Sequence, residues 1–145
     1  MVVARELLCS PLMTRANAET LNKISATIIE AAIEIHRAVG PGLLESAYLS
    51  CLARDLSSRL RIDVQKAIPL RYKSVLIECA YRADMVVEES VVVEVKAIDA
   101  LGPIHRQQMY TYLRLGDYPL GLILNFAAPT MKQGISRVVN NFPDR

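Results

Sequence analysis

The stretch "RADMVVEESVVVEVKA", residues 82–97, contains two apolar runs separated by three polar residues. Both runs are rich in valine, which favours β-strands, and the polar residues 88–90 suit a short hairpin loop. If these three residues form the loop, Val87 faces Val91 across an antiparallel pair of strands. The stretch therefore predicts a β-hairpin with a defined register.

The same register predicts a cluster of charges inside this valine-rich hairpin. Asp84 falls directly opposite Glu94, and Lys96 shares the face of Glu94 because strand side chains alternate. Directly opposed residues bring their Cβ atoms within about 5 Å. Two carboxylates that close resist joint ionisation, and a bound Mg²⁺ relieves their repulsion. A lysine beside them suits phosphodiester hydrolysis, although acid–lysine pairs also occur on strand faces for structural reasons alone.

The rest of the chain predicts an α/β fold with a mixed sheet of about four strands flanked by helices. The expected elements, in order, are helices at Leu21–Val39 and Leu43–Leu60, three strands within residues 63–98, a helix at Pro103–Leu115, a strand at Tyr118–Phe126 and a helix at Lys132–Val139. The helix between the third and fourth strands allows those two strands to be parallel. Residues 1–19 are expected to form a loose leader, and residues 20–145 a single domain.

Composition narrows the class of protein. A chain of 145 residues with 52% hydrophobic residues can bury a hydrophobic core without disulfide bonds or structural metal ions, and such a composition is not that of a disordered chain. The net charge of +2 is too small to indicate nucleic-acid binding by itself, so such a partner must be argued from a local site.

Three distant cysteines exclude a four-ligand zinc or iron–sulfur site. We expect Cys9, Cys51 and Cys79 to be reduced thiols in or near the core of a cytoplasmic protein. No apolar run reaches the roughly 20 residues of a membrane span, and the N-terminus lacks the apolar core of a signal peptide, so we expect no membrane association.

Several motifs, in this order, resemble the PD-(D/E)XK nuclease superfamily. The acid followed by Glu-x-Lys in residues 82–97 resembles its core motif, and "QMYTY", residues 108–112, resembles the Gln-x-x-x-Tyr motif of the RecB-type branch. "GLLESAY", residues 42–48, matches the signature of the GxxExxY protein family, which is assigned to this superfamily. "YPLGLILNF" and "KQGISRVV" are similar to that family's closing segments, so the resemblance covers about residues 21–139.

The resemblance implies a restriction-endonuclease-like core and a nuclease that uses Mg²⁺ or Mn²⁺ to hydrolyse DNA. It implies roles for six residues: the metal ligands Glu45, Asp84 and Glu94, the catalytic lysine Lys96, and the helix residues near the scissile phosphate, Gln108 and Tyr112. One departure is that Ala83 stands where the superfamily has a proline before the acid.

Two other classes of function stay open. The first is a non-catalytic module that keeps the nuclease fold and binds nucleic acid or protein. The second is a homo-oligomer in which the charge cluster is only structural. The intact acid–acid–lysine set favours the nuclease, whereas the small net charge and the lack of an obvious basic arm favour the alternatives. A chain of this size also suits a homodimer, because a second subunit would help to cover a DNA duplex.

Overall fold

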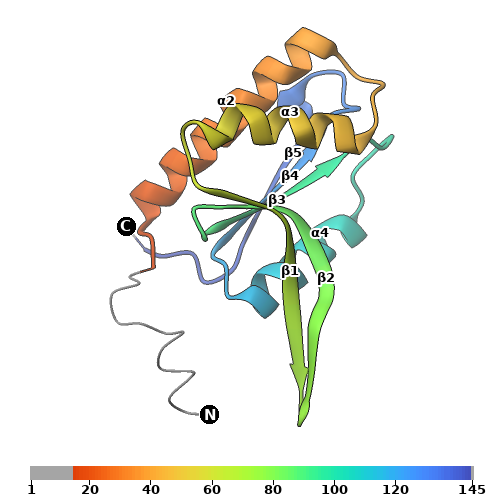
Figure 1. The fold of residues 1–145 in the computed structure, drawn as a ribbon. Helices are drawn as coiled ribbons and strands as arrows, with labels where there is room; N and C mark the ends of the chain where they lie inside the picture. The colour runs from red at the N-terminus through yellow and green to blue at the C-terminus, as the bar shows by residue number, and fades with distance from the viewer. Residues whose placement is uncertain (1–14, 145) are drawn as a thin grey trace.

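The computed structural model describes residues 15–144. It contains a mixed five-stranded sheet with helices on both faces (Figure 1). The elements are α2 (Ala18–Val39), α3 (Glu45–Ser57), β1 (Ile62–Tyr72), β2 (Val75–Val87), β3 (Val91–Lys96), α4 (Pro103–Gly116), β4 (Leu120–Asn125), the 3₁₀ helix η1 (Met131–Gly134) and β5 (Ile135–Val139). The expected α/β class with a mixed sheet is confirmed.

The strands lie in sequence order, β1-β2-β3-β4-β5. All neighbours are antiparallel except β3 and β4, which pair in parallel with Val91 opposite Leu120. Helix α4 provides the crossover between those two strands, as the sequence predicts. The carboxyl ends of β3 and β4 therefore lie at the same edge of the sheet.

The prediction of a final helix at residues 132–139 is wrong. Only η1 is helical there, and Ile135–Val139 forms β5, which pairs with β4 and makes five strands rather than about four. The segment "ISRVV" is rich in β-branched residues, and β4 offers it a free edge with unpaired backbone groups. Gly134 allows the close approach, because a Cβ there would lie 2.2 Å from the carbonyl oxygen of Asn125.

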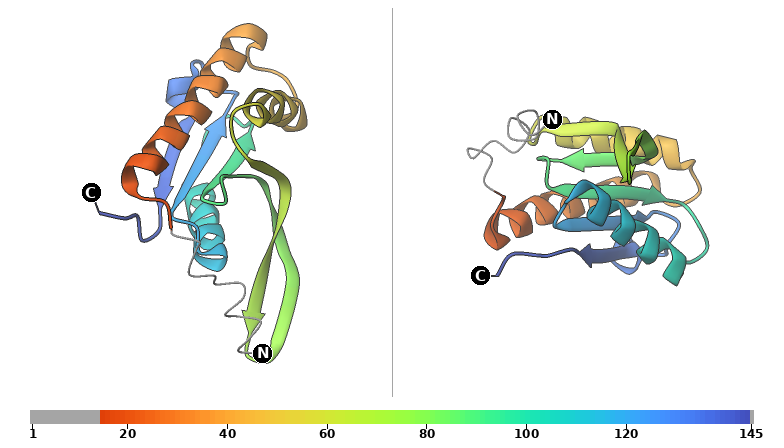
Figure 2. Two further views of the ribbon diagram at one scale, coloured as in Figure 1. Left: turned by 60° about the vertical axis from the view of Figure 1, so that its left-hand side comes forward. Right: turned by 90° about the horizontal axis from the view of Figure 1, so that it is seen from below.

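Both faces of the central strands are covered (Figure 2). Val93 and its alternate neighbours pack in one core cluster with α2 and α3, whereas Val92 packs with Met109 and Leu113 of α4 in the other. This explains why β3 and β4 are almost continuously apolar in sequence. Within residues 15–144, every helix is too short or too polar to span a lipid bilayer.

Helix α2 begins at Ala18, where the side chain of Asn17 caps it by accepting a hydrogen bond from the Thr20 N–H at 2.9 Å. Residues 18 and 19 of the expected leader are therefore helical, and residues 1–14 lie outside the described residues. Among the cysteines, Cys51 packs partly against the core, but Cys79 is exposed, which corrects the expectation for that thiol; Cys9 is not described.

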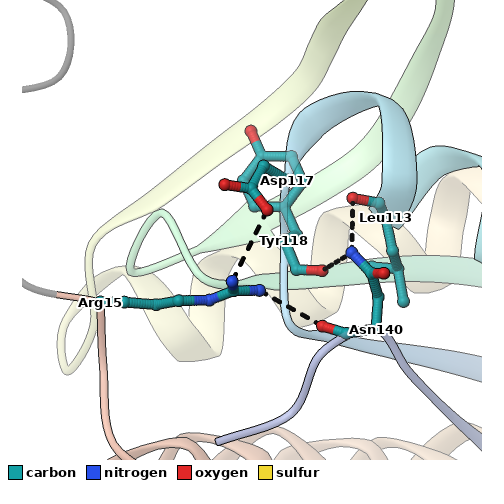
Figure 3. A network of polar contacts seen from close by, with 5 residues as sticks. All are labelled: Arg15, Leu113, Asp117, Tyr118 and Asn140. Atoms are coloured by element: carbon teal, nitrogen blue, oxygen red, sulfur yellow. Dashed lines mark hydrogen bonds and ion pairs between the residues drawn. The ribbon is translucent and has the colours of Figure 1, made fainter.

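A polar network joins Arg15, ahead of α2, to Asn140, directly after β5 (Figure 3). The guanidinium of Arg15 donates to the carbonyl oxygen of Asn140 at 3.2 Å and lies 3.6 Å from the carboxylate of Asp117. The buried Asn140 side chain donates to the carbonyl oxygens of Leu113 and Tyr118. These bonds fasten the residue ahead of α2 and the residue after β5 to the turn between α4 and β4.

The turn between α2 and α3 depends on two glycines and one tyrosine. Gly40 and Gly42 have φ values of +69° and +109°, a region that favours glycine. The hydroxyl of Tyr48, in α3, donates to the carbonyl oxygen of Gly40 at 2.6 Å and accepts from the Leu43 N–H at 3.1 Å. Its ring is fully buried and stacks on Phe126 at 4.4 Å between centroids. Tyr48 thus holds the turn to the sheet and fixes where α3 begins.

We expect Tyr48→Phe to lower the free energy of unfolding by about 1–3 kcal/mol, because two backbone groups of the turn lose their partner while the stacked ring stays. Urea unfolding followed by circular dichroism measures this change. Tyr110→Phe is the matched control, because Tyr110 is exposed, and we expect it to leave the midpoint unchanged. Equal midpoints for Tyr48→Phe and wild type would contradict the role given to the hydroxyl.

Candidate functional site

The β2–β3 hairpin has the register that the sequence predicts. Val87 pairs with Val91 across a loop of residues 88–90, and the ladder continues as far as Met85 opposite Val93. One step further along, the ladder stops, at the two acidic positions. The charged residues therefore lie where regular backbone pairing ends.

At that point two carboxylates replace the backbone pairing. The Asp84 N–H donates to Oε1 of Glu94 at 2.9 Å, and the Val95 N–H donates to Oδ2 of Asp84 at 2.9 Å. Each acid thus accepts a hydrogen bond from the backbone of the opposite strand. The structure brings Asp84 and Glu94 together, as predicted.

The other side of β2 is irregular at the same position. The β1–β2 pairing skips Asp84 and Gln65, although the residues on either side of both are paired. Gln65 has a φ of +56°, a left-handed conformation that is uncommon for a residue with a side chain. Asp84 is therefore released from regular pairing with both neighbouring strands, which leaves its carboxylate free to turn toward β3.

Burial makes the acid pair electrostatically costly. The pKa of Glu94, which is 7% exposed, is raised to about 7 by burial and, second, by the charge of Asp84. The pKa of Asp84 is also raised, mainly by burial, although its bond from Val95 and the charge of Lys96 oppose the rise. The single charge of Lys96 does not compensate a buried and a half-buried carboxylate, so further positive charge would stabilise the pair.

Glu45 approaches the pair from the first turn of α3. Its Oε2 accepts a hydrogen bond from the Ala97 N–H at 3.0 Å, which joins α3 to the end of β3. Its charge contributes to the raised pKa of Asp84, and both residues line an open pocket of about 480 Å³. The glycine turn and Tyr48 set the start of α3, so they also set the position of Glu45.

Lys96 is the last residue of β3 and is half-buried. Its positive charge lowers the pKa of both Asp84 and Glu94, yet it forms no ion pair shorter than 4.0 Å within residues 15–144. The buried side chain of Asn125 accepts from the Ile98 N–H and donates to the Ile98 carbonyl oxygen. Asn125 thereby fixes the chain directly after Lys96 and leaves the ammonium near the acids but unpaired with them.

Tyr112 comes to the site from α4, but Gln108 does not contact it. The Tyr112 ring stacks on Tyr81 of β2 at 3.5 Å between centroids, and burial raises the pKa of both phenols, with Glu94 adding to each shift. The buried Tyr81 hydroxyl has no hydrogen-bond partner among the described residues. Gln108 is exposed, and its side chain makes no hydrogen bond within residues 15–144. The aromatic pair therefore borders the acids, with one unused hydroxyl.

Comparison with protein families gives a match over most of this fold. The model of the PD-(D/E)XK nuclease superfamily matches residues 22–138, a range that runs from the second turn of α2 to the penultimate residue of β5. The chain belongs to the PD-(D/E)XK nuclease superfamily. Comparison with curated proteins and with solved structures returns no match. The fold is consistent with the restriction-endonuclease-like core of this superfamily, and membership indicates a nuclease-like domain with a nucleic-acid substrate.

PD-(D/E)XK nucleases generally use divalent metal ions. Within residues 15–144, no three His, Cys, Asp or Glu side chains gather tightly enough to hold a metal by themselves. The donor chemistry nevertheless fits Mg²⁺, which is commonly held by one or two carboxylates together with water and substrate phosphate. Asp84 and Glu94 supply two carboxylates whose pKa values are raised in the absence of added charge, and Glu45 borders the same pocket as Asp84.

Three residues that support the site were not predicted. Asn125 lies near the end of an otherwise apolar strand. A polar side chain at such a position needs a buried hydrogen-bond partner, and this is the sequence signal that could have identified it. Tyr81 lies three positions before Asp84 but carries no motif. Gln65 has no sequence signal, because its role comes from the backbone conformation that it adopts.

The raised pKa of Glu94 predicts how stability depends on pH. Because the pKa in the folded state, about 7, lies above the ordinary value of 4.5, the folded protein holds an extra proton between these values. Stability should therefore fall as pH rises from about 4.5 to about 7, by on the order of 3 kcal/mol. We expect Glu94→Gln to remove most of this slope in metal-free urea unfolding. Glu34→Gln, on an exposed acid of α2, should keep the slope, and a wild-type profile that is flat over this range would contradict the assignment.

Proposed function

We propose that this protein is a divalent-metal-dependent nuclease that hydrolyses phosphodiester bonds in DNA. The observation that carries the proposal is the meeting of two carboxylates, with Glu94 bonded to the backbone of Asp84, Asp84 bonded to the backbone of Val95, and Lys96 two positions after Glu94 in β3. The motif at residues 42–48 supports placing the chain in the GxxExxY group, and Tyr112 at the site supports the RecB-type branch. The free thiols Cys51 and Cys79 support a cytoplasmic location.

Asp84 and Glu94 would hold the metal, either Mg²⁺ or Mn²⁺, with Glu45 as a third carboxylate from α3. When bound, the metal supplies positive charge that balances the buried acids and stabilises the charge that develops on a phosphate. The hydrogen bonds from the backbone keep one oxygen of Asp84 and one of Glu94 in place. The acids are thereby oriented before any ligand arrives, which reduces the cost of binding.

Lys96 would stabilise the negative charge that develops on the phosphate during hydrolysis. Its ammonium has no ion-pair partner within residues 15–144, so it can serve an anionic substrate. The hydroxyl of Tyr81 is buried beside Tyr112 without a partner among residues 15–144, so it can donate a hydrogen bond to an enclosed water at the edge of the site. Gln108, one helical turn before Tyr112, would reach the substrate from the exposed side of α4.

A non-catalytic binding module is the second candidate, and one observation favours it. The backbone N–H groups already satisfy one oxygen of each acid, so the pair could act only as a clamp between β2 and β3. In that case the fold would bind nucleic acid or protein without cutting. Metal binding and turnover, measured separately, distinguish the two candidates.

Divalent metal should stabilise the folded protein through binding linkage. At a metal concentration a hundredfold above its Kd we expect a gain of about 3 kcal/mol, seen as a higher Tm with Mg²⁺ or Mn²⁺ than with EDTA. Asp84→Asn should lose most of this gain because one ligand is gone. Glu34→Gln serves as the control and should keep it. An equal metal-induced shift in wild type and in Asp84→Asn would remove these acids from the ligand set.

Lys96→Ala should lower metal-dependent cleavage of DNA by about 10²-fold or more, the scale observed when one electrostatic stabiliser of a transition state is lost. Binding should fall less than turnover, because the lost interaction forms fully only in the transition state. The measurement needs single- and double-stranded substrates and both metals. Lys23→Ala, on an exposed lysine of α2, should cleave like wild type. Wild type that binds DNA but cuts no substrate would favour the non-catalytic module.

A further inference from the structure

The β1–β2 hairpin extends well beyond the body of the protein (Figures 1 and 2). We call residues 66–82 the arm. Its inner part includes Ile68 and Tyr81, which are paired and pack in the cluster under α4. Beyond that pair, every residue from 71 to 80 is exposed, so the outer arm has no partner among the described residues.

The arm begins beside the candidate site. Gln65 and Asp84, which line the same pocket, lie one and two positions outside the two ends of the arm. From Ile68 to the turn at Lys73 the strand adds five residues, which correspond to about 17 Å at the usual rise per residue. A molecule held against the arm would therefore also pass the acids.

The arm concentrates the positive charge of the chain. It contains the four cations Lys66, Arg71, Lys73 and Arg82 and the single carboxylate Glu78, a net charge of +3. Because the whole chain carries +2, all residues outside the arm sum to −1. None of the four cations forms an ion pair with a residue in the range 15–144. The hairpin gathers cations that are dispersed in the sequence, which is why no basic arm is obvious from the sequence alone.

The tip of the arm is apolar as well as basic. Tyr72, Val75, Leu76 and Ile77 are 63%, 54%, 48% and 43% exposed. Such a group of exposed apolar residues marks an interaction surface, and a two-stranded hairpin alone is only marginally stable in water. The ammonium of Lys73 lies 5.3 Å from the centroid of the Tyr72 ring, so charge and apolar surface are combined at the tip.

We propose that the arm lies in the major groove of double-stranded DNA and holds the duplex against the site. This inference rests on the proposed function, which places the bond that is cut at the acids. The major groove of B-form DNA admits a two-stranded β-ribbon, and 17 Å along the axis corresponds to about five base pairs. Arg71 and Lys73 would contact phosphates, while Val75 and Ile77 would lie against apolar groups such as the thymine methyls.

The charge of the arm selects duplex DNA over other partners. A second copy of the chain would bring an identical +3 arm to a symmetric contact, where like charges repel. Double-stranded RNA has a major groove too deep and narrow for protein side chains to read. A single strand has no groove to fill. B-form DNA offers both a dense negative charge and a groove of suitable width.

The test measures binding of the full-length protein to duplex DNA in EDTA, so that no cleavage occurs. The variant Arg71→Gln/Lys73→Gln should bind at least about 10-fold more weakly near 0.1 M salt, and the slope of log Kd against log salt should fall by about 2. Lys73→Gln alone should lower the slope by about 1. Arg37→Gln/Arg54→Gln removes the same charge from exposed positions of α2 and α3 and should change neither quantity. Circular dichroism should show the same Tm for each variant.

Cleavage and oligomeric state, measured on the same proteins, separate the explanations. An arm variant that binds duplex DNA as tightly as wild type would overturn the inference. If wild type also cleaves DNA in that case, the proposed function still stands. Arm-dependent binding without any cleavage would support the inference and overturn the proposed function. A dimer seen by light scattering that dissociates in the arm variant, with unchanged DNA affinity, would assign the arm to a second copy and overturn its role in DNA binding.

Discussion

The candidate site depends on two hydrogen bonds between β2 and β3, from the Asp84 N–H to the Glu94 carboxylate and from the Val95 N–H to the Asp84 carboxylate. Each carboxylate takes the place of a backbone partner on the opposite strand, so the ladder between β2 and β3 ends without leaving these N–H groups unsatisfied. The strands can then separate, and the space between them contains two acids. The residues that satisfy the backbone where the ladder ends are therefore also the residues whose charge a ligand would have to balance.

The supporting residues show how the rest of the fold serves this position. Glu45 reaches the end of β3 only because α3 starts at a fixed place, which Tyr48 and the left-handed Gly42 determine. From the other side, Asn125 holds the segment that follows Lys96. The motif Gly-x-x-Glu-x-x-Tyr thus combines one residue that touches the site with two that set its position. A pattern of this kind can persist for structural reasons, so metal binding and turnover need separate tests.

Local patterns in the sequence predicted the hairpin and the order of the first seven elements, because alternation and turn residues act over a few positions. Val87 opposite Val91 is the clearest example. The segment Ile135–Val139 was mistaken for a helix because its pairing with β4 depends on an edge that exists only in three dimensions. Asp84 and Glu94 were predicted to meet, but their bonds to the backbone were not, since these depend on where the ladder stops. The proximity of Gln65 to the acids likewise depends on a left-handed backbone that no residue type signals.

The distribution of charge imposes a further constraint on any function at this site. Outside the arm the chain is slightly negative, and the site combines the buried Glu94 with the half-buried Asp84, so the site by itself repels a polyanion. A phosphate can approach only if positive charge is added at the acids and if the approaching molecule is held elsewhere. Lys96 lies next to the acids but does not balance both of them, which is consistent with the raised pKa of Glu94. The positive charge of the arm would attract a polyanion at a distance from the acids. A divalent cation would attract the phosphate at the acids themselves. Under the proposed function, holding the substrate and balancing the charge of the acids are therefore separate requirements, which the arm and a bound metal ion would meet.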